Sequence, residues 1–228
     1  MMKALPLLLV SGIAAAEPRS FTHTFEYATL AADTTDVQLW HREVITNRGP
    51  ETLDDDLAIG FGVADHFEAD LLAQVIDDGT GLRFGSLRGE TRVRVADRGE
   101  LPIDIGIHAG VGKEFGARIY DLYARLVLAR DFDRLTIAAT GQVLVHRGTD
   151  GEGREYDGAA GLTYELAPRF HLGVEGWAAS DHDKTSAGFG PALGFRASQQ
   201  LWIALMAGPA AYDDAWRFDG RVIIGFAR

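Results

Sequence analysis

The chain has 228 residues, of which 46% are hydrophobic and 10% aromatic, and a formal net charge of −11 at pH 7. This length suits one sizeable domain. The excess of acidic residues argues against a nucleic-acid partner, because such a partner requires a basic patch on the protein. The chain contains no cysteine, which excludes a disulfide framework and lipid attachment through a cysteine.

The first 16 residues have the pattern of a secretory signal peptide. Lys3 supplies a short positive region, residues 4–13 are mostly apolar, and three alanines at 14–16 offer a cleavage site. We therefore expect a signal peptide over residues 1–16. Its apolar stretch is shorter than the roughly 20 residues that a transmembrane helix needs. No longer apolar run follows, so a mature chain that enters a membrane would have to do so as a closed β-barrel.

From residue 34 onward, apolar and polar residues alternate, which predicts β-strands because successive side chains of a strand point to opposite faces. In the clearest segment, Ile103, Ile105 and Ile107 share one face. In the segment before it, Val93 lies on one face and Arg92 on the other. The segments, about twelve in all, cover residues 35–45, 56–64, 67–76, 82–96, 101–111, 118–129, 134–146, 155–166, 170–179, 186–196, 200–209 and 215–226.

Every second connection between these segments is short, as at Asp65-His66 and Pro168-Arg169, and the intervening ones are richer in glycine and acidic residues. An even number of strands, with short turns at one end and longer loops at the other, is typical of a transmembrane barrel in the outer membrane of Gram-negative bacteria. The short turns would then face the periplasm. We predict an all-β fold: a closed, antiparallel, up-and-down transmembrane barrel of about 12 strands over residues 34–228.

A propeller or a sandwich is the alternative fold. The apolar faces contain many alanine and glycine residues, however, and the 27 glycines of the chain suit a curved, closing sheet. Residues 17–33 precede the first predicted strand. We expect them either to lie in the periplasm or to enter the barrel as a plug, and the stretch from Phe21 to Asp33 could occupy the interior.

Two stretches near the N-terminus resemble an uncharacterised porin-like group of bacterial outer-membrane β-barrel proteins. They are Phe21-Thr22-His23-Thr24-Phe25, with the pattern aromatic-Thr-x-Thr-aromatic, and Gln38-Leu39-Trp40. The resemblance is specific in the first quarter of the chain and general in the rest. It implies a barrel that is exported and assembled in the outer membrane, with no known chemistry.

The last predicted strand has the amphipathic, aromatic character that the barrel-assembly machinery recognises, and we expect this machinery as a partner. Trp216, Phe218 and Phe226 carry that character. Outer-membrane barrels usually end on an aromatic residue, whereas Ala227 and Arg228 follow Phe226 here. Either the recognition signal tolerates two extra residues, or the machinery recognises this strand more weakly.

If the isoleucine face contacts lipid, the alternate residues face the lumen, where charges of both signs can pair across neighbouring strands. Such a lumen is either a charged conduit that selects solutes or a network of ion pairs that fills the barrel. A barrel of about 12 strands lies between filled barrels of roughly eight and open ones of roughly sixteen. The predicted lumen-lining residues are Glu68, Asp70, Gln74, Arg88, Glu90, Arg92, Arg94, Asp104, His108, Arg125, Glu165, Glu175, Arg196, Arg217, Asp219 and Arg221.

The connections opposite the short turns carry most of the acidic residues. Carboxylates at an outer rim could attract cations, or bind divalent ions that bridge lipopolysaccharide phosphates, but a solvated mouth is the simpler interpretation and the one we prefer. Outer-membrane lipid and lipopolysaccharide are the expected surroundings. The predicted outer-rim acids are Asp54, Asp55, Asp56, Asp77, Asp78, Asp181, Asp183, Asp213 and Asp214.

The leading functional hypothesis is porin-like passage of small polar solutes or ions through a charged, narrow lumen. The alternatives are a closed barrel with a structural or interaction role, and a hydrolase at the outer rim. Asp181-His182-Asp183 and Asp213-Asp214 resemble omptin-type proteases in residue type only. No nucleophile, base and orienting group occur together as catalysis requires, so we predict no enzyme. The histidines lack metal-ligand spacing, and we expect neither metal nor cofactor.

Overall fold

The computed structural model describes residues 19–25, 27–46, 52–77, 81–115, 120–148, 151–181, 184–213 and 215–228. The expected signal peptide lies outside the described residues. So do Asp78, His182, Asp183 and Asp214.

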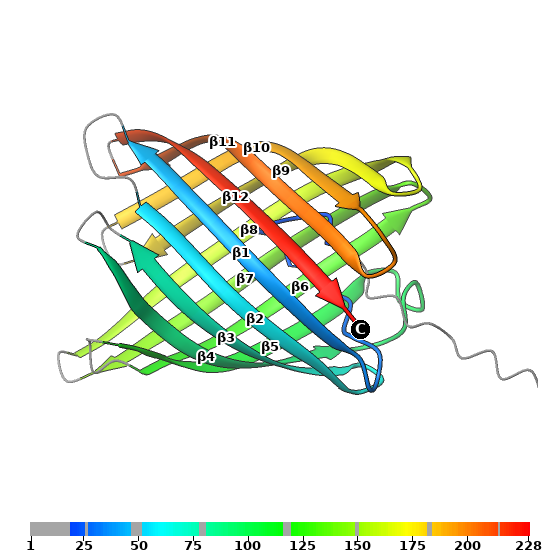
Figure 1. Ribbon diagram of the computed structural model, residues 1–228, viewed down its shortest axis with the longest axis horizontal. Helices are drawn as coiled ribbons and strands as arrows, with labels where there is room; N and C mark the ends of the chain where they lie inside the picture. The colour runs from blue at the N-terminus through cyan, green and yellow to red at the C-terminus, as the bar shows by residue number, and fades with distance from the viewer. Residues whose placement is uncertain are drawn as a thin grey trace, which may run out of the picture.

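Twelve antiparallel strands form one closed barrel, in which each strand pairs with its neighbours in sequence and β1 pairs with β12 (Figure 1). The predicted fold is confirmed. The strands are β1 (Thr35–Thr46), β2 (Thr52–Ala64), β3 (Phe67–Asp77), β4 (Leu82–Arg94), β5 (Asp104–Glu114), β6 (Tyr120–Phe132), β7 (Leu135–Gly148), β8 (Gly151–Ala167), β9 (Phe170–Asp181), β10 (Lys184–Arg196), β11 (Leu201–Tyr212) and β12 (Ala215–Ala227).

Both ends of the barrel-forming chain meet at the rim that carries the short turns. Beyond the β1–β12 ladder, the Thr35 N–H donates to the Arg228 carbonyl and the Arg228 N–H donates to the Thr35 carbonyl, each at 2.8 Å. Two residues suffice to turn the chain at Asp65-His66 and at Pro168-Arg169. We take this rim as periplasmic, following the usual orientation of outer-membrane barrels.

Most strand limits differ from the sequence prediction, by up to four residues. The largest differences at strand starts are in the second strand, which begins at Thr52 instead of residue 56, the fifth, at Asp104 instead of residue 101, and the eighth, at Gly151 instead of residue 155. As a result, the connections predicted to be long are short, and the turn over residues 95–103 at the periplasmic rim is longer than the gap between β1 and β2. The acidic run at the start of β2 has a loop-like composition, but it continues the ladder with β1.

The outside of the barrel is apolar. Leu39, Leu71, Ile107 and Leu126 on four different strands are each 47–48% exposed, and many more large apolar side chains share this outward direction. In water such a band would be unfavourable, whereas in a bilayer it contacts lipid tails. Closure of the sheet leaves no strand edge unpaired in that apolar medium. The protein is therefore a membrane barrel of the bacterial outer-membrane type.

No helix among the described residues is long and apolar enough to cross a membrane.

The barrel has a filled interior. Residues 19–25 and 27–30, which precede β1, lie inside it (Figure 1), and Phe21, Phe25 and Tyr27 from this segment form a buried cluster with Trp40 and Trp202 from the wall. We name residues 19–25 and 27–30 the plug segment.

Candidate functional site

The plug segment is packed against the barrel wall from the inside. Phe21, Thr22 and Thr24 are 0–1% exposed, and Tyr27 and Leu30 are also buried. Its described residues form no strand, so they belong to no ladder of the wall. The segment is therefore held by side-chain contacts, and it can in principle move without opening the barrel.

One carboxylate, that of Glu175 on β9, holds the first turn of the plug segment. It accepts hydrogen bonds from the Thr22 N–H and hydroxyl, both at 2.9 Å, from the His23 N–H at 2.7 Å, and from the Thr24 N–H. Glu175 itself is 2% exposed. Hydrogen bonds to a buried carboxylate are stronger than neutral ones, so this residue is the main polar anchor of the turn.

A second carboxylate anchors the other end of the plug segment. The Leu30 N–H donates to Oε2 of Glu68 on β3, at 2.7 Å. Between the two anchors, the guanidinium carbon of Arg125 lies 3.4 Å from the centre of the Phe25 ring, within cation–π range. The plug segment thus contacts strands β9 and β3, which lie far apart around the barrel.

Inward-facing glycines leave room for the plug segment. A Cβ on Gly161 would lie 2.5 Å from the Phe21 ring, and one on Gly62 would lie 3.2 Å from the Leu30 carbonyl carbon. A Cβ on Gly106 would come within 3.1 Å of the Tyr27 Cα, and one on Gly194 within 3.2 Å of the Ser20 Cα. The wall and the segment are therefore fitted to each other at several strands.

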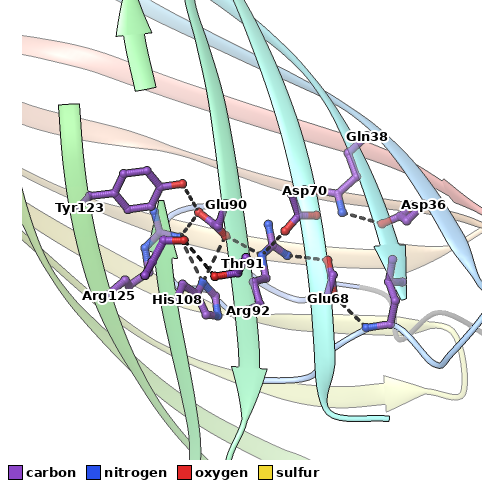
Figure 2. A network of polar contacts seen from close by, with 12 residues as sticks. Asp36, Gln38, Glu68, Asp70, Glu90, Thr91, Arg92, His108, Tyr123 and Arg125 are labelled. Carbon is purple, nitrogen blue, oxygen red and sulfur yellow. Dashed lines mark hydrogen bonds and ion pairs between the residues drawn. The ribbon is translucent and has the colours of Figure 1, made fainter. Parts of the chain in front are cut away.

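A buried network of charges fills the lumen beside the plug segment (Figure 2). Arg92 on β4 contacts Glu68 at 3.2 Å, Asp70 at 2.9 Å and Glu90 at 2.6 Å. The Arg92 side chain is only 6% exposed. Removing one partner of such a network leaves an uncompensated buried charge, which is strongly destabilising.

The network continues from Glu90 toward β5 and β6. Glu90 accepts a hydrogen bond from the Tyr123 hydroxyl at 2.5 Å, and its carboxylate lies 3.4 Å from Arg125 and from His108 (Figure 2). The side chains of Glu90, Arg125 and His108 are all at most 9% exposed. Polar contacts therefore run across β3, β4, β5 and β6 at one level of the lumen.

A cavity of about 410 Å³ lies on the extracellular side of the plug segment. We name it the vestibule. His23 and Trp177 stack in it with ring centres 5.3 Å apart, and the guanidinium of Arg221 lies 5.0 Å from the Trp40 ring. Its charged lining residues are Arg42, Asp54, Asp56, Arg88, Arg125, Glu155, Asp157 and Arg221. The vestibule can thus offer a polar solute aromatic faces and charges of both signs.

A smaller cavity of about 120 Å³ lies on the periplasmic side. Phe21, Tyr27 and Ser20 form its inner wall, and Arg98, His171 and Arg196 are among the other lining residues. Phe21 and Phe25 belong to the same short segment and line the smaller cavity and the vestibule, respectively. The plug segment therefore separates the two cavities.

The structure places the predicted lumen residues on inward-facing positions, as their pairing partners show. Nine are buried: Glu68, Asp70, Glu90, Arg92, Asp104, His108, Arg125, Glu175 and Asp219. Seven are partly exposed inside: Gln74, Arg88, Arg94, Glu165, Arg196, Arg217 and Arg221. Glu175 and Glu68 contact the plug segment, and Arg88, Arg125 and Arg221 line the vestibule.

Several lumen residues were missed by the sequence prediction. Asp36, Gln38, Trp40 and Arg42 alternate along β1 and face inward, and Arg42 forms an ion pair of 2.8 Å with Asp219. The period-2 rule that was applied to β3 to β5 would have found them.

Asp54, Asp55 and Asp56 were predicted as outer-rim acids, with Asp54 and Asp55 in the connection before the second strand and Asp56 at the start of that strand. The placement of Asp54 and Asp55 in a connection was wrong. All three belong to β2. In the β1–β2 ladder Asp54 lies opposite Arg42 and Asp56 opposite Trp40, so both face the lumen and line the vestibule. Asp55 faces outward, and its carboxylate lies 2.7 Å from His41. Of the remaining predicted rim acids that the structure describes, Asp77 and Asp181 end strands, and Asp213 lies in the turn after β11.

The histidine–aspartate contacts of the described chain are dispersed. His41–Asp55 lies on the outer wall, His66–Asp97 (2.9 Å) at the periplasmic turns, and His146–Asp121 (2.8 Å) inside the barrel. The described residues contain no group of three or more His, Asp or Glu side chains that could hold a metal ion. The proposed rim site around His182 lies outside the described residues.

No protein-family model and no curated protein matches the sequence. An outer-membrane channel from Pseudomonas putida F1 is similar in structure, with a TM-score of 0.65 and 9% identity over 89% of this chain and 98% of that one. The NanC porin has a TM-score of 0.57 and 10% identity, and the KdgM porin 0.57 and 13%, each over 84% of this chain and 98% of the porin. At such identities the likeness concerns the fold, and by fold the chain is similar to the channels and porins of the bacterial outer membrane.

Proposed function

We propose that the protein is an outer-membrane channel for small polar solutes or ions, and that the plug segment is its gate. The observation that carries this proposal is the position of the plug segment between two cavities, where it is anchored by Glu175 and Glu68 and paired to no strand. In this conformation the channel is closed.

The lining of the vestibule supports the proposal that the transported solute is polar. Arginine side chains from β1, β4 and β12 face the cavity together with carboxylates from β2 and β8, and the Trp40 and Trp177 rings lie among them. Side chains that line a lumen set its selectivity. One solved structure of the similar KdgM porin contains an oligogalacturonate, which is consistent with a polar solute for a barrel of this fold.

The test is single-channel conductance in planar bilayers, comparing the mature chain with a variant that lacks residues 19–30. Retained heat-modifiable gel mobility shows that each protein is folded. We expect rare, brief openings of the mature chain and long-lived openings of the shortened variant, because the segment that separates the cavities is gone. A folded variant without conductance would contradict the proposal.

The second candidate is a closed barrel with a structural role. The buried ion network around Arg92 favours it, since buried charges that satisfy one another can fill a lumen permanently. The same recording separates the two functions, because a lumen closed by the network stays closed when the plug segment is removed.

A further inference from the structure

The outer wall of the barrel carries a group of basic and aromatic residues at its extracellular end. Lys113 on β5, Tyr120 on β6, Arg147 on β7 and Glu152 on β8 lie side by side in one row across the sheet. Arg154 is two residues beyond Glu152 on the same outward face. We name these five residues, with Tyr156, the basic rim patch.

The charges of the basic rim patch are open to the surroundings. The side chains of Arg147 and Arg154 are 65% and 62% exposed, and Tyr120 and Tyr156 are more than half exposed. The Lys113 amino group lies 5.3 Å from the centre of the Tyr120 ring. Three positive side chains and one carboxylate leave a net charge of +2 in a chain whose total charge is strongly negative.

Glu152 gives the patch its geometry. Its carboxylate oxygens lie 3.8 Å from Arg147, its partner on β7, and 3.4 Å from Arg154 on its own strand. Because exposed ion pairs of this length contribute little to stability, both guanidinium groups remain available to another anion. Glu152 therefore places the two arginines next to each other without neutralising them both.

The outermost row of the patch, Lys113 to Glu152, lies just beyond the apolar band. Leu122, Leu126 and Val143 face outward in that band, each 40–47% exposed, and Arg154 shares a row with Leu122 while Tyr156 shares one with Val143. In a bilayer, the residues directly above this band lie at the level of the lipid headgroups, where aromatic girdles also occur. On β1 and β2, the outward face at the same end carries Asp55 and Glu43 instead.

We propose that the basic rim patch is a binding site for the phosphate groups of lipid A in the outer leaflet. A guanidinium group matches phosphate oxygens in a bidentate manner, and two adjacent guanidinium groups with a nearby ammonium match a phosphorylated headgroup whose acyl chains lie along the apolar band. The patch thus fixes one lipid molecule against β5–β8. This site is independent of whether the lumen conducts.

The test is native mass spectrometry of the purified, delipidated mature chain titrated with bisphosphoryl lipid A, with lipid A stripped of both phosphates, and with inorganic phosphate. We expect bisphosphoryl lipid A to bind at least about tenfold more tightly than the stripped lipid, since each basic residue near an anionic surface contributes about fivefold. We expect inorganic phosphate alone to bind far more weakly, because it lacks the acyl chains. Equal binding of the two lipids would overturn the proposal without any variant.

A triple variant, Lys113→Gln with Arg147→Gln and Arg154→Gln, locates the site. We expect it to lose the preference for phosphorylated lipid, while Lys113→Arg with Arg147→Lys and Arg154→Lys retains most of it. Gel mobility confirms that both variants are folded. An unchanged preference in the glutamine variant would place the site elsewhere, and a change only in oligomer mass would assign the patch to a second copy of the chain.

Discussion

The Glu175 carboxylate on β9 accepts hydrogen bonds from both the N–H and the hydroxyl of Thr22, which stands 153 positions earlier in the chain. The N–H groups of His23 and Thr24 donate to the same carboxylate. One side chain of the wall thus fixes a turn that belongs to no strand. Loss of its charge should release the plug segment while the twelve-strand ladder stays intact.

The substitution Glu175→Gln tests this relationship. The amide has one acceptor oxygen and no charge, so several hydrogen bonds to the plug segment weaken, each charge-assisted bond being worth about 1.5–3 kcal/mol. We expect the open probability in planar bilayers to rise at least about tenfold with unchanged gel mobility. A Glu175→Gln channel as quiet as the parent would show that this carboxylate does not hold the gate.

A bulky side chain that displaces the plug segment should also open the channel more often. A leucine at Gly161 must displace the Phe21 ring, because even a Cβ would lie 2.5 Å from it. We expect Gly161→Leu to increase conductance. The matched control is Gly141→Leu on β7, where a Cβ meets nothing within 4 Å. Equal conductance of the two variants would contradict the tight packing of Phe21 against Gly161.

The buried network predicts a large loss of stability at Arg92. Replacing it by methionine leaves three carboxylates without their shared cation, which should cost about 3–5 kcal/mol in urea unfolding from phospholipid vesicles. Arg94→Met in the same strand is the control, because Arg94 pairs at 3.0 Å with Asp97, which is 61% exposed. Its expected cost is at most about 1 kcal/mol. Similar losses in the two variants would refute a stabilising role for the network.

Arg88 should influence which ions pass. It lines the vestibule together with Asp54 and Asp56, so Arg88→Gln leaves the carboxylates in excess. Measured as reversal potential in the variant without residues 19–30, the cation preference should increase about threefold, as expected for one unit charge in a water-filled lumen. Lys113→Gln, on the outer wall, should not change it. A cation preference unaltered by Arg88→Gln would remove this residue from the conduction path.

The periplasmic turns give a prediction on pH. A hydrogen bond with His66 lowers the pKa of Asp97 below its usual value. Because the folded pKa is the lower one, this contact stabilises the turns above the unfolded pKa, and the stabilisation is lost as pH falls through the folded pKa. In carboxyl NMR titrations, His66→Gln should raise the pKa of Asp97. A pKa that does not move would assign the shift to Arg94.

Alternation in the sequence was sufficient to predict the barrel, because one face of each strand contacts lipid and the other the interior, which fixes the parity of every side chain. It could not fix the strand ends. Asp54 and Asp56 have the composition of a loop, yet each faces inward opposite β1. The location of the plug segment depends on contacts between distant parts of the chain, as between Thr22 and Glu175. The local sequence pattern therefore could not decide whether the plug segment lies in the periplasm or in the lumen.

The claim that the plug segment gates the channel is tested most directly by cross-linking this segment to the barrel wall. A Cβ at Gly194 would lie 3.2 Å from the Ser20 Cα, so cysteines at the two positions are near enough to be joined once the segment shifts by a few tenths of an ångström to reach the distances of a disulfide; the chain contains no cysteine of its own. We would introduce Ser20→Cys and Gly194→Cys together with Glu175→Gln and record conductance before and after reduction. A gate predicts silence in the oxidised protein and openings after reduction, with both single-cysteine proteins insensitive to reductant. Equal conductance in the oxidised and reduced states would contradict the account.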